Sequence, residues 1–222
     1  MLSIICAYND KILLKKLLLQ SLRKQKDVEY ETIFLNAKEL GFRSAAETLN
    51  FGCSKAKGDF FVICHQDIVF ESENVLKEIE DYCKKLQFGI VGVAGIASIN
   101  KQSYVVSRIK EGPQKNIAGN YRNFNDPIKS YSLDECLFVI PSENFTKFND
   151  LGMTWHLYAS DYAYQCHKDN LEVYTLPIEN IYHASNGKSF NFNYFEALEK
   201  LSQKIINTFI QSTENGQQIH FF

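Results

Sequence analysis

Short apolar blocks alternate with amphipathic segments along the first third of the chain. The blocks at residues 2–7, 32–35 and 60–64 are nearly continuous apolar runs, a pattern typical of parallel strands that are covered on both faces. Between them, apolar residues recur every three or four positions, which is the spacing of one face of an α-helix. The order strand, helix, strand, helix, strand predicts a Rossmann-type α/β domain, with a mainly parallel central sheet flanked by helices.

The two helices between these strands have recognisable ends. Asn9 or Asp10 is expected to cap the first helix, because both side chains accept hydrogen bonds from free backbone amides. The second helix is expected to run through residues 45–56 and to end at Gly58, in the left-handed conformation that glycine adopts without strain. The predicted buried face of the first helix consists of Ile12, Leu13, Leu17 and Leu22.

The rest of the chain is predicted to form further strands and helices. An amphipathic helix capped by its first residue is expected over residues 72–86, and residues 90–99 are expected to pair with 104–107 around a turn at 100–101. Residues 111–130 show no period, which is typical of a mobile functional loop. Further along, we expect strands at 133–140 and 171–178, an extended piece at 181–183, and helices at 161–167 and 194–212.

Composition excludes several classes of function. The chain of 222 residues has 45% hydrophobic residues and a formal net charge of -2, whereas a general nucleic-acid binder carries a basic surplus. Its six cysteines are scattered without a C-x-x-C pair, which favours buried free thiols in a reducing cytoplasm. The chain starts directly in a predicted strand and lacks an apolar run of about 18 residues. We therefore expect a cytoplasmic protein without a secretory signal or a membrane span.

A polar cluster follows the third predicted strand. His65, Gln66 and Asp67 come directly after the apolar run at 60–64. In open α/β sheets, ligands bind at the carboxyl ends of the strands, so these side chains are candidates for a binding site. The alternative is a polar loop that only caps the strand, and the cluster alone does not decide between the two.

The approach to this cluster carries a spaced motif, N-x-G-x-x-x-A-x-G-D, followed by an apolar run and then x-x-D. Its residues are Asn50, Gly52, Ala56, Gly58, Asp59 and Asp67. The motif resembles that of the family 2 glycosyltransferases of GT-A fold, and the resemblance extends from Ile4 to about His183. In that family an aspartate-x-aspartate motif ends a strand and holds the divalent metal of a nucleotide-sugar. Here His65 stands in place of the first aspartate, and Asp67 matches the second.

The resemblance implies that residues 1–99 bind the nucleotide-sugar. The first strand ends in Ala7, Tyr8 and Asn9, which match the family's first nucleotide-contacting segment. Asn36 stands where the family usually has an aspartate that contacts the base or ribose. Packing for Tyr8 and turn formation for Asn36 explain these residues equally well. The implied nucleotide-sugar site is Ala7, Tyr8, Asn9, Asn36, Asn50, His65, Gln66 and Asp67.

The resemblance also implies a divalent metal, Mn²⁺ or Mg²⁺, beside the diphosphate. The family often places a histidine after the catalytic helix and one strand as an additional metal ligand, and His183 with Ser185 and Gly187 fits that H-x-S-x-G pattern. The expected metal ligands are Asp67 and His183, with a further contact from His65 to the metal or the ribose. A packed or surface histidine is the open alternative for His183.

The catalytic residues are expected later in the chain. Asp161 matches the family's catalytic base, which takes the proton of the attacking hydroxyl, although a helix cap is the alternative for an aspartate at a predicted helix start. Asp134 and Glu135 lie where the family places an acidic residue that faces the acceptor or donor sugar. Neighbouring side chains on a strand point to opposite faces, so at most one of them is expected to face the site. Trp155 and His156 are expected beside the sugar, with packing as the alternative for the tryptophan.

The resemblance as a whole implies a single GT-A-like domain over residues 1–222, with an acceptor-side half at 100–193 and a C-terminal helix and tail at 194–222. The expected reaction transfers a sugar, with inversion, from a nucleotide-sugar to a hydroxyl of a carbohydrate or lipid-linked acceptor. The loop at 186–193 is expected to close over the substrate. The expected setting is bacterial surface-polysaccharide assembly at the inner face of the membrane, with peripheral association.

A protein of a different class is the alternative. His65 and Asn36 both depart from the family pattern. A GT-A fold without activity is then expected to bind a nucleotide-sugar or to act as a scaffold in a larger complex. Turnover of a donor with and without acceptor separates the two hypotheses.

Overall fold

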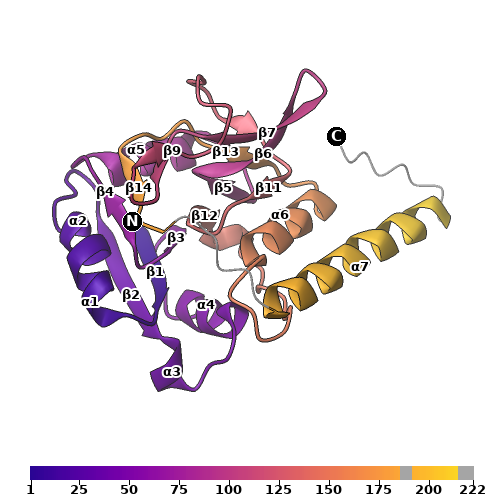
Figure 1. Cartoon of the computed structure of the whole chain (residues 1–222), viewed down its shortest axis with the longest axis horizontal. Coiled ribbons are helices and arrows are strands. Elements are labelled where there is room, and N and C mark those ends of the chain that lie inside the picture. The colour runs from indigo at the N-terminus through magenta and orange to yellow at the C-terminus, as the bar shows by residue number, and fades with distance from the viewer. Residues whose placement is uncertain (186–191, 215–222) are drawn as a thin grey trace.

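A seven-stranded sheet forms the middle layer of the protein, whose computed structural model describes residues 1–185 and 192–214, with side chains up to residue 208. Its strands are β1 (Leu2–Tyr8), β2 (Tyr30–Asn36), β3 (Phe60–Cys64), β5 (Ile90–Gly92), β10 (Ile128–Lys129), β12 (Leu137–Pro141) and β13 (Val173–Thr175). The strand order is β10-β13-β5-β12-β3-β1-β2 (Figure 1). β12 and β10 run opposite to the other five strands. The predicted mainly parallel sheet is therefore confirmed.

Two smaller sheets accompany the central one. Their strands are β4 (Ile68–Phe70), β6 (Ala94–Ile99), β7 (Gln102–Ser107), β8 (Lys110–Glu111), β9 (Asn116–Ile117), β11 (Ser132–Leu133) and β14 (Ile181–His183). One sheet has the order β11-β6-β7 and the other has the order β4-β14-β8-β9. The predicted turn between β6 and β7 is confirmed, because Asn100 and Lys101 both adopt the left-handed backbone that a two-residue hairpin turn requires.

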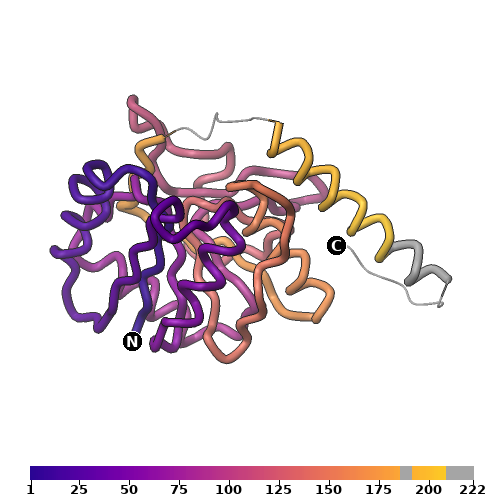
Figure 2. Tube along the Cα trace, turned by 90° about the horizontal axis from the view of Figure 1, so that it is seen from below, coloured from indigo at the N-terminus to yellow at the C-terminus, as the bar shows by residue number. Residues whose placement is uncertain are grey.

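Helices cover both faces of the central sheet. One face packs against α1 (Lys11–Leu14), the π-helical turn η1 (Lys15–Leu19), α2 (Gln20–Leu22) and α5 (Val75–Lys85). The other face packs against α4 (Ala45–Cys53) and α6 (Tyr158–Lys168). The remaining helical segments are α3 (Ala37–Leu40), the 3-10 turn η2 (Ser142–Asn144) and α7 (Phe192–Glu214). α7 projects from one side of the body, as Figures 1 and 2 show.

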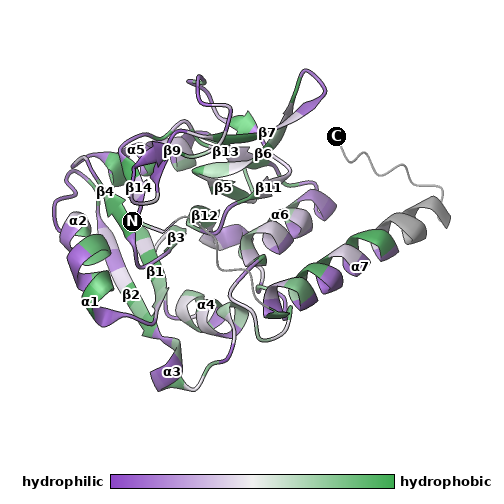
Figure 3. Ribbon diagram, in the orientation of Figure 1, coloured by the Kyte–Doolittle hydropathy of each residue, from purple (hydrophilic) through white to green (hydrophobic). Residues whose placement is uncertain are grey.

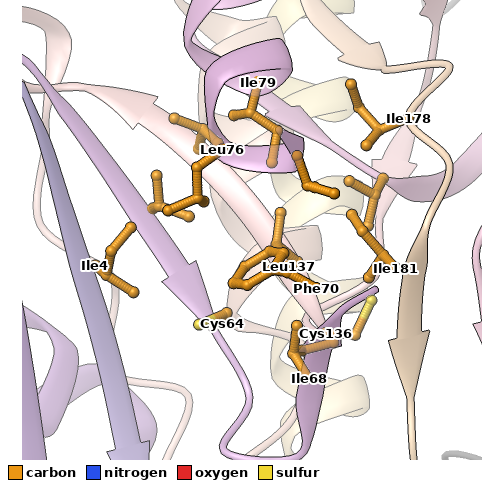
Figure 4. Packing of buried hydrophobic residues seen from close by; sticks show 14 of the residues in the cluster. Ile4, Cys64, Ile68, Phe70, Leu76, Ile79, Cys136, Leu137, Ile178 and Ile181 are labelled. Atoms are coloured by element: carbon orange, nitrogen blue, oxygen red, sulfur yellow. The ribbon is translucent and has the colours of Figure 1, made fainter. Parts of the chain in front are cut away.

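β1 illustrates how the sheet separates its two apolar cores. Leu2, Ile4 and Cys6 belong to the core beneath α1, α2 and α5, whereas Ile5 belongs to the core beneath α4 and α6. Alternate side chains of a strand point to opposite faces, so an unbroken apolar run is what a strand covered on both faces requires. Figure 3 shows the apolar positions concentrated on the inner strands and the inward faces of the helices. Figure 4 shows part of the first core, to which Ile4 of β1 and Leu76 of α5 both belong.

The buried face of the first helix differs from the predicted one. Asp10 caps this helix, as expected, by accepting hydrogen bonds from the amides of Ile12 and Leu13. Leu22 is 1% exposed, as predicted, but Ile12 is 66% exposed, whereas Leu14 is 4% exposed and Leu18 is fully buried. Leu14, Leu18 and Leu22 stand four residues apart, so this leucine-rich run offers a second stripe at helical spacing, and packing selects that stripe.

Gly58 is required for close packing, and the prediction of a left-handed helix end was wrong. α4 ends at Cys53, and Gly58 is absent from the positive-φ glycines of the described chain. Its amide donates to the Ser3 hydroxyl oxygen at 2.8 Å. A Cβ at Gly58 would lie 2.7 Å from the backbone nitrogen of Ser3, so the chain reaches β1 here only because no side chain intervenes.

Several predicted boundaries also shift. α5 follows Asn74 instead of a cap at Ser72, and the predicted strand at 133–140 divides into β11 and β12 with a turn between them. The segment at 111–130 contains β9 and the strand β10. α6 begins three residues before Asp161, which is therefore not its cap. Most of the loop predicted at 186–193 lies outside the described residues. In the described part of the chain, no helix has the length and apolar character needed to cross a bilayer.

The burial of Leu14 and the exposure of Ile12 lead to a stability prediction. Leu14→Ala should lower the free energy of unfolding by about 3 kcal/mol, because it opens a cavity in the core. Ile12→Ala should change it by no more than about 0.5 kcal/mol, because Ile12 is mostly exposed. Urea denaturation of both variants measures the difference. Equal losses would show that the first helix buries Ile12, as the sequence pattern predicts.

Candidate functional site

Three segments bring polar side chains to one end of the central sheet. His65 follows β3, and its amide donates to the carbonyl of Cys136 at 2.9 Å. Asp67 directly precedes β4, and His183 is the last residue of β14. β4 and β14 pair in antiparallel register with His183 opposite Ile68. This pairing places His183 beside Asp67, although the two residues are far apart in the sequence.

The side chains of these three residues converge. His65 Nδ1 lies 3.2 Å from His183 Nε2, and His183 Nε2 lies 3.5 Å from Asp67 Oδ1. One donor atom from each residue can be chosen so that all three lie within 4.8 Å of one another. Ser185 completes the cluster, because its amide donates to Asp67 Oδ2 at 3.0 Å and its hydroxyl oxygen lies 3.0 Å from His183 Nε2.

The ionisable side chains of this cluster are buried close together, so the charge of each one shifts the pKa of the others. Asp67 and His183 are 8% and 6% exposed. Burial opposes ionisation of Asp67, but its hydrogen bond with His183 and the neighbouring imidazoles outweigh burial and lower the pKa of Asp67 to about 2. Burial likewise acts to lower the pKa of His183, but the contact with Asp67 raises it above the usual value. Asp67 is thus an anion at neutral pH and attracts a cation to this point.

His65 is a neutral imidazole whose orientation is restrained on both sides. Burial, reinforced by His183, lowers the pKa of His65 to about 4. Its Nε2 lies 3.2 Å from the hydroxyl of Tyr158, on the side opposite to His183. Tyr158 is the first residue of α6 and is 8% exposed. A buried helix end therefore fixes the direction in which this imidazole points.

A divalent metal fits this donor set. Two imidazoles and one carboxylate are common metal ligands, and an ion bound at about 2.1 Å by two ligands at right angles holds their donor atoms about 3 Å apart. The separations of 3.2 and 3.5 Å are close to that value. His65, Asp67 and His183 are thus the residues that could hold an ion.

A cavity of about 740 Å³ opens on one side of the cluster. Gln66 links its wall together, because Gln66 Oε1 accepts hydrogen bonds from the amides of Asn9 and Asp10 and Gln66 Nε2 donates to Asn9 Oδ1. The lining draws on both predicted halves of the chain. The sequence-predicted residues in the lining are Ala7, Tyr8, Asn9, His65, Gln66, Asp67, Trp155 and His156.

A second cavity, of about 500 Å³, opens on the other side. It shares His65, His156 and Ser185 with the first cavity, so the two spaces meet at the cluster. Its described lining contains three carboxylate side chains and no lysine or arginine. These carboxylates are Glu111, Asp134 and Glu135.

Asp134 and Glu135 both line the second cavity, and the expectation that at most one of them faces the site was wrong. The reason is that they lie in the turn between β11 and β12, where strand alternation does not apply. Asp134 is exposed, and its Oδ1 accepts from the amide of Cys136 at 2.8 Å. Glu135 accepts from the amide of Leu157. Burial, together with the neighbouring Asp134, raises the pKa of Glu135 to about 8, so this carboxyl is mostly protonated at neutral pH.

A family model described as "Glycosyltransferase like family" matches residues 2–205. The chain belongs to this glycosyltransferase-like family. Among curated proteins, none matches the chain.

Solved structures of GT-A glycosyltransferases share the fold of this glycosyltransferase-like protein. S. aureus TarS 1-349 in complex with UDP-GlcNAc is 12% identical, with a TM-score of 0.62 over 93% of this chain and 66% of TarS 1-349. The mannosyltransferase PcManGT from Pyrobaculum calidifontis, in complex with GDP-Man and Mn²⁺, is 14% identical, with a TM-score of 0.61 over 93% of this chain and 64% of its own. GalNAc-T7 with UDP, GalNAc and Mn²⁺ is 13% identical, with a TM-score of 0.58 over 90% and 47%. The chain thus spans less than two thirds of each of these chains, and at these identities the similarity establishes the fold.

Two residues predicted to bind the nucleotide-sugar hold the local structure of this glycosyltransferase-like chain instead of lining a described cavity. Asn36 caps α3, where its side chain accepts from the amide of Glu39 and donates to the Glu39 carboxylate. Asn50 makes paired hydrogen bonds with the backbone of Phe148, at 2.9 and 3.0 Å. Neither residue lines the first or the second cavity.

Asp161, the predicted base, is buried between two helices. Its Oδ1 pairs with Lys204 of α7 at 2.5 Å, and its Oδ2 accepts from Asn149 and Gln165. The side chain is about 2% exposed and lines neither of the two cavities. Its catalytic role therefore stays a prediction, and its contacts favour a structural role.

Sequence reasoning missed Tyr158 and Glu111. Tyr158 lies between the singled-out residues Trp155 and Asp161, but its aromatic ring fits a core position equally well, so no local signal distinguished it. Glu111 enters the second cavity because β8 pairs with β14, a contact between segments distant in the sequence.

The pairing of Asp161 with Lys204 yields a testable consequence. Asp161→Asn keeps an oxygen for Asn149 and Gln165 but removes the anion, so it should lower the free energy of unfolding by about 2 kcal/mol, less than for a fully buried pair because the Lys204 side chain is 30% exposed. Replacing Lys204 by Met in the same chain should recover part of the loss. Urea denaturation of the two single variants and the double variant measures the coupling. Strictly additive losses would contradict a stabilising ion pair.

Proposed function

We propose that this protein transfers a sugar from a nucleotide-sugar to a hydroxyl acceptor. The observation that carries the proposal is the meeting of two cavities at the cluster of His65, Asp67 and His183. A transferase that displaces one substituent by another needs two binding spaces that share one reaction point. The family membership and the nucleotide-sugar complexes of the structural neighbours support this function.

The first cavity is proposed to bind the nucleotide-sugar. It lies at the carboxyl ends of β1 and β3, where ligands bind in open α/β sheets. Among its described lining residues, Lys38 is the one lysine or arginine. A diphosphate carries more negative charge than one exposed lysine offsets, so a bound divalent ion at His65, Asp67 and His183 would neutralise the charge of the departing diphosphate.

The second cavity is proposed to bind the acceptor, with Asp134 as the base. Asp134 is exposed to the cavity and uses one carboxylate oxygen for the turn, which leaves the other for the acceptor hydroxyl. Glu135 is a poorer candidate, because its raised pKa leaves it mostly protonated. The acceptor oxygen forms a bond to the anomeric carbon, the bond from that carbon to the diphosphate oxygen breaks, the leaving oxygen takes the electron pair, and the proton passes to Asp134. A single displacement of this kind inverts the anomeric centre.

The biological setting is proposed from the family resemblance. It is surface-polysaccharide assembly in a bacterium, at the cytoplasmic face of the membrane, with a carbohydrate or lipid-linked acceptor. The competing proposal, a nucleotide-sugar binder without turnover, is favoured by Asn36, which caps its own helix and lines neither cavity.

Two measurements on one preparation separate these proposals. A thermal-shift screen of nucleotide-sugars with and without Mn²⁺ identifies the donor, because a ligand that binds only the folded state raises the Tm. Release of nucleoside diphosphate from that donor, with and without a panel of acceptors, then tests turnover. Binding without any release would leave the non-catalytic proposal standing, and no shift with any donor would contradict both.

The metal centre is tested with Asp67→Ala. This variant should lose the Mn²⁺-dependent part of its affinity for UDP or GDP, because the anionic ligand is gone. Calorimetric titrations with and without Mn²⁺ measure that part. Asp126→Ala, at an exposed position outside the cavities, is the control and should bind like the wild type. Equal affinity of Asp67→Ala and wild type in the presence of Mn²⁺ would contradict a metal-assisted site.

The identity of the base is tested by two amide variants. Asp134→Asn keeps an oxygen for the Cys136 amide but cannot accept the acceptor proton, so transfer should slow by about a hundredfold while donor affinity stays unchanged. Asp161→Asn should transfer at nearly the wild-type rate once it is shown to be folded. Initial transfer rates at saturating donor compare the two. A slow Asp161→Asn beside a fast Asp134→Asn would restore the base that the family resemblance implies.

A further inference from the structure

Tyr158 contacts the one residue of the cluster that departs from the family's metal motif. The two ring nitrogens of His65 have different neighbours: Nδ1 faces His183, and Nε2 faces the Tyr158 hydroxyl, each at 3.2 Å. The aspartate that the motif usually carries at this position has no second nitrogen and needs no such partner. Tyr158 therefore supplies the hydrogen-bond partner that a histidine at this position needs and an aspartate does not.

The position of Tyr158 is determined by its surroundings. Its ring lies 5.9 Å from that of Phe138 in β12 and 6.2 Å from that of Phe148, measured between centroids. The side chain is 8% exposed and begins a buried helix. A hydroxyl held in this way offers a fixed hydrogen-bond acceptor to His65 Nε2.

A metal-binding imidazole needs such an acceptor. Nitrogen coordinates a metal through its lone pair, so a bond from Nδ1 requires the proton to be on Nε2. Histidine ligands usually donate that proton to a carboxylate, carbonyl or water, which fixes the tautomer and the ring orientation. Here the Tyr158 oxygen occupies the corresponding place.

We propose that Tyr158 is a positioning residue that holds His65 as an Nδ1 metal ligand, so that the cluster is a two-imidazole, one-carboxylate centre selective for Mn²⁺ over Mg²⁺. The inference rests on the proposed metal site and names its chemistry. Replacing an aspartate by His65 removes one negative charge and one oxygen donor. Mg²⁺ demands oxygen ligands in nearly ideal octahedral geometry. Mn²⁺ also favours oxygen ligands, but as a first-row transition metal it tolerates nitrogen donors, as Mg²⁺ does not.

The positioning role is tested with Mn²⁺ alone, by electron paramagnetic resonance of the free ion in titrations of the whole chain. Tyr158→Phe should weaken Mn²⁺ binding by about tenfold or more, the usual size of an outer-shell effect. The matched control is Tyr162→Phe, one turn along α6, whose hydroxyl accepts from the Thr146 amide and whose ring packs against Phe145 and Phe148. Tyr162→Phe should bind Mn²⁺ like the wild type.

The His65→Asp variant serves as a second background, which distinguishes a positioning role of Tyr158 from a contribution to fold stability. His65→Asp supplies an oxygen ligand that does not need the tyrosine, so adding Tyr158→Phe to His65→Asp should leave Mn²⁺ affinity unchanged. His65→Asp should also let Mg²⁺ displace Mn²⁺ at a much lower excess than in the wild type. Electron spin-echo modulation of bound Mn²⁺ should show coupling to two imidazole nitrogens in the wild type and to one in His65→Asp.

Several outcomes would overturn the inference. These are a Tyr158→Phe affinity for Mn²⁺ within twofold of wild type, an equal loss in Tyr162→Phe, a loss that persists in the His65→Asp background, a single nitrogen coupling in the wild type, or no Mn²⁺ binding at all. None of them depends on turnover. A protein that binds Mn²⁺ as expected but releases no nucleoside diphosphate from any donor would contradict the proposed sugar transfer and leave this inference intact.

Discussion

The pairing of β4 with β14 is the contact on which the candidate site depends. His65 and His183 are 118 residues apart in the sequence, and this antiparallel pair brings them within 3.2 Å. The apolar residues of the two strands, Ile68, Phe70 and Ile181, are almost fully buried and supply the hydrophobic stabilisation of the contact (Figure 4). The polar cluster follows directly at the strand ends. The apolar core therefore determines the geometry of the site, although it takes no part in the chemistry.

Asp161, Glu135 and Asp67 differ in what neutralises them, and this difference separates their roles. Removing a carboxylate from water is costly unless hydrogen bonds or a cation replace the solvent. Asp161 has a lysine and two amide donors, so its lone pairs are occupied. Glu135 has one backbone amide and a raised pKa. Asp67 has histidine and Ser185 partners at the edge of a cavity. Only the last arrangement keeps an anion at neutral pH next to open space.

Sequence reasoning succeeded where the relevant signal is local. The strand β3 is an apolar block, and the polar residues that follow it, His65, Gln66 and Asp67, lie at the sheet's carboxyl edge. The placement of those residues at the first cavity could therefore be predicted from the chain alone. The family resemblance added Tyr8 and also His183, which no local pattern connects with Asp67.

The remaining errors come from side-chain directions that tertiary contacts decide. Asn36 and Asn50 have short polar side chains that bond to backbone or ligand equally well, and here each bonds to protein. Asp161 has the right position in the sequence, but Lys204 from a distant helix pairs with it. In the leucine-rich first helix the buried stripe contains Leu14 and not Ile12, because packing selects one of two stripes at helical spacing. None of these outcomes is encoded within a few residues of the position concerned.

The common wall of the two cavities has a thermodynamic consequence. Because His65, His156 and Ser185 line both cavities, ligands in the two cavities would contact the same three side chains. If the first ligand orders these side chains, the second ligand does not bear that entropic cost again. Linkage requires this effect on affinity to be reciprocal. Affinity for one ligand is then a function of the concentration of the other. Binding in the two cavities would then be coupled through the three side chains that they share.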